Sequence, residues 1–211
     1  MKTMIQLVLV TILSLGFAVT SFAGIKGSAH DLTALAGTGS DEICIYCHTP
    51  HNSTEGNGVP LWSMTVSAGN TGYTPYSSQT LDAQIGTDVL VGPSRVCMTC
   101  HDGTIAMNSA VVGATPVTMS SIEGTTAALG TDLSNDHPIG FDYTAVSVTA
   151  DTEIKDEDTS PLGNGMIVDA LFQGTTMTCA SCHEVHEPGD SGYFLLTEND
   201  GSNLCLACHD K

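Results

Sequence analysis

The chain has one long apolar run, and it lies at the start. Residues 4–19 are apolar except at three polar positions, and Lys2 just before them supplies a positive charge. Ser21 and Ala23 follow at the −3 and −1 positions of a signal-peptidase site. Because the run is shorter than the ~20 residues that span a bilayer, the pattern predicts a signal peptide over residues 1–23, removed after Ala23, in preference to an uncleaved anchor.

The remainder of the chain has no apolar run of membrane length and little regular periodicity. Residues 52–94 are rich in Gly, Thr, Ser and Asn, and residues 102–178 in Thr, Gly, Ala and Val. These compositions predict mostly loops, with a turn at residues 73–76 and a short β-prone piece at residues 146–148. The acidic residues 151–158 predict a solvated loop.

All eight cysteines fall into four segments of the form C-x-x-C-H, here called motifs 1 to 4. Two thiols at this spacing can bond to the two vinyl groups at one edge of a porphyrin, and the next residue, His, then lies under the ring and reaches the iron. The pattern is the attachment signature of c-type haem. The predicted attachment residues are Cys44 and Cys47, Cys97 and Cys100, Cys179 and Cys182, and Cys205 and Cys208. The predicted proximal ligands of haems 1 to 4 are His48, His101, His183 and His209.

Two other chemistries use a C-x-x-C segment, namely a redox-active disulfide and half of a zinc site. Four copies, each with His in the same place and no cysteine left over, favour haem. The sequence therefore predicts four haem c groups. Helix is expected only as short turns at the four motifs and over residues 190–197.

Four histidines remain after the proximal ligands are assigned, which is one for each haem. The match predicts two imidazole ligands on every iron, a ligation that favours low reduction potentials and leaves no open position for a substrate. We therefore expect no enzymatic activity. The predicted distal ligands are His30, His51, His137 and His186. The alternative is a methionine as sixth ligand, from among Met64, Met107, Met119, Met166 and Met177.

His51 and His186 each follow a proximal histidine by three residues. Residues at this spacing are close neighbours, so they cannot occupy opposite faces of one porphyrin. Each must serve a different haem from the histidine before it, which predicts haems close enough for fast electron transfer. On this basis His51 is assigned to haem 2 and His186 to haem 4.

The order of elements repeats along the chain: a leading histidine, a C-x-x-C-H-x-x-H segment, then a C-x-x-C-H-D segment. The repeat predicts one tetrahaem domain over residues 24–211, built from two diverged dihaem units at about residues 24–130 and 131–211. The leading His30 and His137 allow two wirings. In a closed scheme they serve haems 1 and 3 of their own units. In an open scheme His137 serves haem 1, and His30 serves haem 3 of a neighbouring copy.

Composition adds two constraints. Aromatic residues are only 5% of the chain, so the haems are expected to supply apolar surface that the side chains lack. The predicted fold class is a multihaem cytochrome, with a mostly irregular backbone, short helical turns and a few short strands wrapped around a row of four haems. The formal charge of −18 excludes nucleic acid as a partner, because phosphate binding needs a basic face.

The placement of histidines around the four motifs resembles the extracellular multihaem cytochrome nanowire family, the tetrahaem outer-surface cytochromes of metal-reducing bacteria. The resemblance rests on residues 27–31, 44–51, 97–103, 135–139, 179–186 and 204–209. It implies a head-to-tail filament of identical subunits with stacked haems. It also implies outer-membrane conduits and extracellular acceptors as electron-transfer partners, and it favours the open scheme, with His30 on haem 3 of a neighbouring subunit.

Two other functions stay open on the residues alone. A monomeric electron shuttle in the periplasm would carry the same four motifs. A multihaem reductase would need one five-coordinate iron. The predicted signal peptide supports export in every case, with the extracellular space or cell surface as the expected location of a filament.

Overall fold

The computed structural model describes residues 24–34, 41–53, 58–64, 66, 72–103, 110–112, 115–117, 122–147, 152–187 and 193–210. The predicted signal peptide lies outside these residues. No helix in the described part of the chain is long and apolar enough to cross a membrane.

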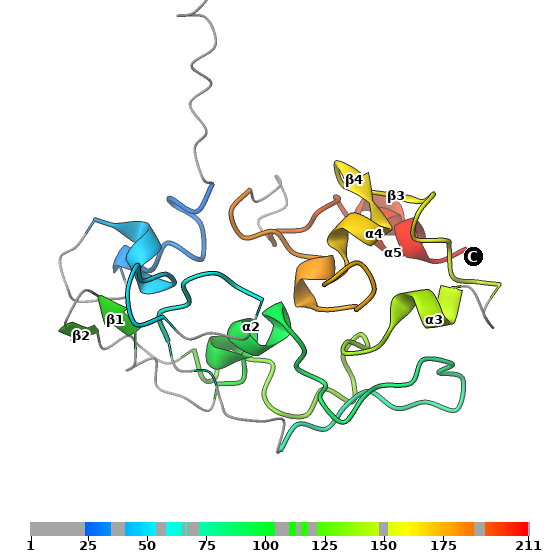
Figure 1. The fold of residues 1–211 in the computed structure, drawn as a ribbon, viewed down its shortest axis with the longest axis horizontal. Helices are drawn as coiled ribbons and strands as arrows, with labels where there is room; N and C mark the ends of the chain where they lie inside the picture. The colour runs from blue at the N-terminus through cyan, green and yellow to red at the C-terminus, as the bar shows by residue number, and fades with distance from the viewer. Residues whose placement is uncertain are drawn as a thin grey trace, which may run out of the picture.

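The described chain is mostly irregular, with short helices and two small hairpins (Figure 1). The α-helices are α2 (Pro93–His101), α3 (Tyr143–Ser147), α4 (Ile167–Ala170) and α5 (Asn203–Cys208). The 3-10 helices are η1 (Leu32–Ala34), η2 (Ile43–Tyr46), η3 (Cys179–Ser181) and η4 (Asp200–Ser202). Two antiparallel hairpins pair β1 (Ala110–Val112) with β2 (Thr115–Val117) and β3 (Pro161–Leu162) with β4 (Gly165–Met166). The expectation of an irregular backbone with few short strands is consistent with this architecture.

Each motif lies on a short helix, as predicted. The longest helix, α2, has nine residues and begins with Pro93 at its first position, where the missing backbone N–H costs nothing. Gly92 precedes it with φ +53°, a conformation that side chains rarely adopt. Motifs 1 and 3 overlap the 3-10 helices η2 and η3, and motif 4 lies largely on α5. Repeated short helices, with loops between them, are therefore the local framework of the chain.

Three local predictions are wrong, and a fourth holds except at one residue. Residues 73–76 form no turn, and Thr74 instead forms a parallel bridge with Asp132. Val146 lies in α3 and not in a strand, because the helix buries it together with Tyr143. Residues 193–197 form no helix and instead bridge to motif 3. The acidic loop is largely exposed as predicted, except that Glu157 is buried, where its carboxylate accepts a hydrogen bond of 2.5 Å from the Ser147 hydroxyl.

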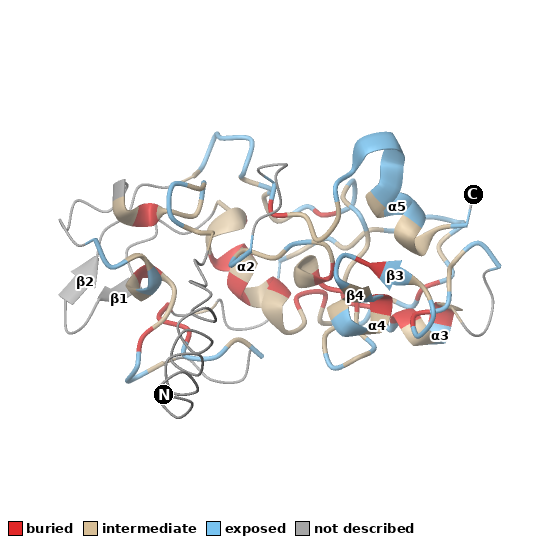
Figure 2. Cartoon of the chain, turned by 90° about the horizontal axis from the view of Figure 1, so that it is seen from above, coloured by how far each residue is buried: buried red, intermediate tan, exposed pale blue. Residues whose placement is uncertain are grey.

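Buried side chains form three separate clusters along the described chain, around η2, along α2 and beside α3, α4 and β3 (Figure 2). The Trp62 cluster holds Leu32, Tyr46, Trp62, Met64 and Val96. The Leu90 cluster holds Val89, Leu90, Met98 and Leu133. The Phe141 cluster holds Ala83, Phe141, Tyr143, Val146, Leu162, Ile167, Leu171 and Met177.

Two of the clusters draw residues from both predicted dihaem units. Ala83 of the first unit packs in the Phe141 cluster, and Leu133 of the second unit packs in the Leu90 cluster. Gly140 donates a backbone hydrogen bond to the Met177 carbonyl and accepts one from Gly86. The two units are therefore packed against each other, and the boundary near residue 130 stays a prediction from the repeat.

Candidate haem sites

The helical turn at each motif places the histidine one turn beyond the first cysteine. In motif 1 the backbone N–H of His48 donates to the Cys44 carbonyl at 2.8 Å. The same bond runs from His183 to Cys179 at 3.1 Å and from His209 to Cys205 at 2.9 Å. In motif 2 the turn belongs to α2, which ends at His101. The local fold thus holds two thiols and one imidazole on a single turn, which is the arrangement covalent haem attachment needs.

No two of the eight cysteines form a disulfide. Burial raises the pKa of Cys47 and Cys182 to about 11 and that of Cys100 to about 12. Cys179 is the exception, because a hydrogen bond with Cys97 lowers its pKa to about 7. Among the described residues, no three His, Cys, Asp or Glu side chains converge as a zinc site would require.

Motifs 2 and 3 lie against each other. The thiols of Cys97 and Cys179 are hydrogen-bonded, and the Ser94 hydroxyl of α2 accepts the backbone N–H of Cys179 at 3.0 Å. Because these cysteines are the first predicted attachment residues of their motifs, haems bound at motifs 2 and 3 would have their attachment edges close together. A row of haems in one chain requires such contacts between motifs.

Three proximal histidines are oriented by backbone carbonyls. The Nδ1–H groups of these rings donate hydrogen bonds at 2.7–2.9 Å, which fixes the tautomer and leaves Nε2 for iron. The pairs are His48 with Pro60, His101 with Ala127 and His183 with Tyr193. Sequence reasoning missed these acceptors, because a backbone carbonyl belongs to every residue and leaves no signal in the sequence.

Three pairs of histidine rings face each other within the chain. Metal–imidazole bonds are about 2.0 Å, and the ring centre lies about 1.1 Å beyond the nitrogen, so two rings on opposite sides of one iron have centres about 6 Å apart. The observed separations are 6.1 Å for His48 and His186, 6.0 Å for His30 and His101, and 6.3 Å for His137 and His209. Each pair joins one predicted proximal ligand to one predicted distal ligand, and the spacing fits a haem iron between them.

Burial favours the ligand form of two distal histidines. Loss of solvent lowers the pKa of His30 first, and the nearby His101 and His183 lower it further. Burial also lowers the pKa of His137. Both rings are therefore neutral at physiological pH, and the neutral imidazole is the form that binds a metal.

His51 and His183 are the two histidines left over. All eight histidines lie in the described residues, and neither of these rings faces another histidine. Both residues are exposed. Within one chain, therefore, no histidine ring faces the proximal ring of motif 3, and the ring of His51, a predicted distal ligand, faces no proximal histidine.

The wiring differs from the sequence-based assignment. The ring of His186 faces His48 of motif 1 and not His209 of motif 4. The segment after motif 3 lies beside residue 24, whose backbone N–H donates to the His186 carbonyl at 2.7 Å. His30 faces His101 of motif 2, and the ring of Phe194 packs against the His30 ring with 4.5 Å between the ring centres. His137 faces His209 of haem 4. These ring pairs differ from the assignments of His51 to haem 2 and His186 to haem 4 and from both schemes for the leading histidines within the chain, and the ligand of each iron stays a prediction.

The ring contacts agree with one part of the spacing argument, although they do not show ligation. His186 faces a different proximal histidine from His183, three residues before it, as neighbours on one side of a porphyrin must. The contact of His30 with a neighbouring copy stays a prediction, because it would form between two chains. In this chain its ring is already placed against His101.

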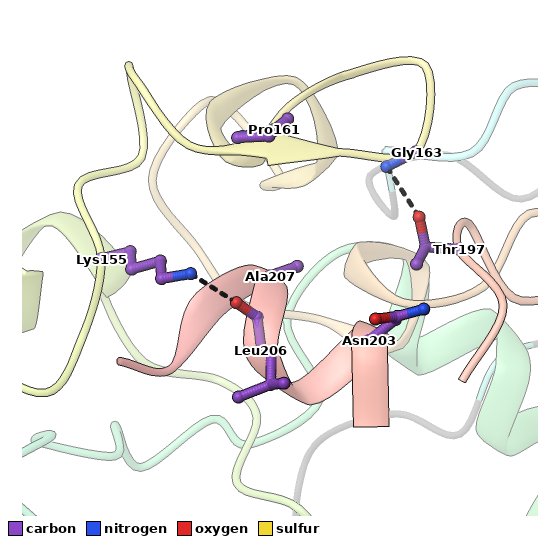
Figure 3. Close-up of a pocket in the computed structure, with 7 residues that line it drawn as sticks. All are labelled: Lys155, Pro161, Gly163, Thr197, Asn203, Leu206 and Ala207. Atoms are coloured by element: carbon purple, nitrogen blue, oxygen red, sulfur yellow. Dashed lines mark hydrogen bonds between the residues drawn. The ribbon is translucent and has the colours of Figure 1, made fainter. Parts of the chain in front are cut away.

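An open pocket of about 310 Å³ adjoins motif 4 (Figure 3). Lys155 spans it and donates a hydrogen bond from Nζ to the Leu206 carbonyl of α5 at 2.6 Å. The backbone N–H of the same lysine donates to the Cys208 carbonyl at 2.8 Å, and Ile154 bridges to His209. These bonds hold the end of α5 so that His209 faces His137.

The comparison with protein families agrees with the motif chemistry. A family model described as a doubled CXXCH motif matches residues 173–211, which hold motifs 3 and 4. No curated protein matches the chain. The paired motifs indicate a c-type cytochrome that binds haem covalently and transfers electrons.

Proposed function

We propose that this protein carries four bis-His haem c groups and polymerises head to tail into an extracellular filament that conducts electrons. The haem irons supply one-electron exchange between the ferric and ferrous states. The chain's own residues attach the porphyrins through the cysteine pairs, orient the imidazoles through Nδ1–H bonds, and fill both axial positions. Filled axial positions leave no place for a substrate, so the function is electron transfer and not catalysis at iron.

The unmatched pair of His51 and His183 is the observation that carries the filament. In the second unit, the histidine three residues after motif 3, His186, faces the proximal ligand of motif 1 in the preceding unit. The equivalent histidine of the first unit is His51, and no unit precedes it in its own chain. By the same rule it ligates haem 3 of a neighbouring copy.

This wiring produces an interface that does not close. Each chain offers His51 at one surface and the open side of haem 3 at another, so each copy binds the next through two different patches. Such a heterologous contact generates an open polymer unless its rotation happens to form a ring. The resemblance to nanowire cytochromes supports a filament of this kind. It implies His30 as the shared ligand, whereas the ring contacts favour His51. External minerals or other cells would be the electron acceptors, reached from outer-membrane conduits.

The exposed His183 also supports a second candidate. A chain that never assembles would keep haem 3 five-coordinate, and a small ligand such as cyanide or nitrite could bind there. This is the reductase hypothesis, and it predicts that cyanide or nitrite binds to the native secreted protein. The filament predicts ligand binding only to dissociated subunits.

The first prediction concerns haem number and spin state. The pyridine haemochrome should report four haems c per chain, and the oxidised assembled protein should be entirely low-spin. Dissociated subunits should show one high-spin haem in four, because haem 3 loses its sixth ligand. Electron paramagnetic resonance on filaments and on dissociated subunits makes the measurement. A stable high-spin fraction in intact filaments would contradict the proposed ligation.

The second prediction concerns salt. The formal charge of −18 makes neighbouring subunits repel each other, and this repulsion is screened over about 10 Å at 0.1 M ionic strength. Assembly followed by light scattering should therefore become faster and more complete as salt or a divalent cation is added. If filaments form more readily as ionic strength falls, charge repulsion does not oppose the contact.

A further inference from the structure

The planes of the facing imidazoles differ between the haem sites. The rings of His48 and His186 are close to parallel, with 22° between their planes. The angle is 82° for His30 and His101 and 72° for His137 and His209. A haem bound at motif 1 would therefore have a nearly parallel ligand pair, whereas haems bound at motifs 2 and 4 would have nearly perpendicular ones.

Ligand orientation acts on the energy of ferric iron. Low-spin ferric iron has one vacancy among three d orbitals, two of which interact with the π electrons of the imidazoles. Parallel rings act on the same one of these two orbitals and split them, so that the vacancy occupies the raised orbital and the ferric state is stabilised. Perpendicular rings act on both orbitals equally. Ferrous iron fills all three orbitals and gains nothing, so parallel rings lower the reduction potential.

The hydrogen bonds of the distal histidine rings also favour a lower reduction potential for haem 1 than for haem 2. His186 donates its Nδ1–H to Oε1 of Glu184 at 3.1 Å, and this oxygen also accepts the backbone N–H of His186 at 2.8 Å. A carboxylate acceptor makes an imidazole a stronger electron donor, which stabilises ferric iron. The Nδ1 of His30, by contrast, is buried and has no hydrogen-bond partner among the described residues.

The proximal histidines of haems 1 and 2 have similar hydrogen bonds, so they do not offset the difference in reduction potential expected from the distal histidines. Both proximal rings donate Nδ1–H to a backbone carbonyl, at 2.8 Å for His48 and 2.7 Å for His101. Haem 4 lies between the two cases, because His137 donates to the carbonyl of Pro138 at 3.0 Å but its ring is nearly perpendicular to that of His209.

We infer that, of the three haems whose two histidines face each other within the chain, haem 1 has the lowest reduction potential and haem 2 the highest. The inference rests on the bis-His ligation proposed above and assigns Glu184 as a positioning and tuning residue. His51 follows His48 by three residues, so the lowest potential falls at the proposed boundary between subunits. Electrons would then reside mainly on haems 2 and 4 and cross haem 1 to enter the next subunit.

The test is a potentiometric titration of the assembled protein followed by electron paramagnetic resonance. Dithionite and one-electron mediators supply one electron to each iron, and no bond forms or breaks. Nearly parallel ligands give a rhombic signal with three resolved features, and nearly perpendicular ligands give a single feature at large g. The rhombic signal of haem 1 should disappear at a lower potential than the two large-g signals.

Glu184→Gln identifies the haem and tests the hydrogen bond. The amide oxygen keeps an acceptor for the His186 backbone but removes the charge, so the midpoint of the rhombic signal should rise while all haems stay low-spin. Glu187→Gln removes the same charge from an exposed residue beside His186 in the sequence, but it leaves the Glu184 hydrogen bond to the ring in place and should leave that midpoint unchanged.

Three outcomes would overturn the inference. They are a rhombic signal that titrates above the large-g signals, no rise in the Glu184→Gln variant beyond that of Glu187→Gln, and a rise that appears in a large-g signal instead. A high-spin signal in the wild-type filament would instead contradict the ligation itself, which separates failure of this inference from failure of the proposed function.

Discussion

Replacing His51 by alanine is expected to abolish filaments while leaving four covalent haems on each chain. The ring of His51 faces no histidine of its own chain, whereas the other three predicted distal ligands each face a proximal ring at 6.0–6.3 Å. Its loss should therefore leave all pairs within the chain intact and turn only haem 3 high-spin, one haem in four. Negative-stain images and electron paramagnetic resonance of the same sample measure both effects.

His30→Ala is the matched control for this prediction. His30 faces His101, so its removal should make haem 2 high-spin, and the contact between copies should persist. The prediction fails if His51→Ala still polymerises, or if His30→Ala dissolves the filaments and leaves haem 2 low-spin. The second outcome would restore His30 as the ligand shared between subunits.

Mixing the His51→Ala variant with wild-type protein gives an independent check. The variant lacks one of the two surfaces of the interface but keeps its own haem 3, which can still accept His51 of a wild-type chain. It should therefore terminate growth at one end and shorten filaments in proportion to the amount added. A variant that leaves filament length unchanged would show that haem 3 is not the other half of the contact.

The sequence was sufficient for the chemistry of the motifs because that chemistry is local. A cysteine pair and the histidine after it lie on one turn, and a turn needs only neighbouring residues, such as His48 and Cys44 in motif 1. The exclusion rule for histidines three residues apart is local too, and it held for His183 and His186. These features required no knowledge of how distant segments meet.

The proximal histidine that each distal histidine faces could not be predicted, because it depends on where loops of different length place distant segments in the fold. The loop after motif 3 carries His186 to His48 and Phe194 to His30, and nothing in its composition indicates either contact. The family resemblance favoured the open scheme, in which the leading His137 serves the preceding unit, whereas in the structure the ring after motif 3, His186, lies against the preceding unit. Local propensity was overridden in the same way at Val146, where burial in a short helix outweighed β preference.

The two units cross at Gly140, where one added methyl group should lower the free energy of unfolding more than it does at Gly124. Gly140 has φ +76°, and a Cβ there would lie 2.6 Å from the carbonyl oxygen of Val89 and 2.9 Å from its Cα. Backbone atoms cannot turn aside as a side chain can. Gly124 has nearly the same φ, +78°, but a Cβ there would meet nothing within 4 Å. The two positions therefore share the conformational cost and differ in the clash.

Gly140→Ala should accordingly lower the free energy of unfolding by more than Gly124→Ala does. A positive φ costs an alanine about 1 kcal/mol at either site, and crowding of a packed backbone should add about 1–3 kcal/mol at Gly140. Guanidinium unfolding followed at the Soret band measures both, in the His51→Ala background so that polymerisation does not contribute to stability. Equal losses in the two variants would mean that the chain at Val89 can move aside, and that the two units are not held rigidly where they cross.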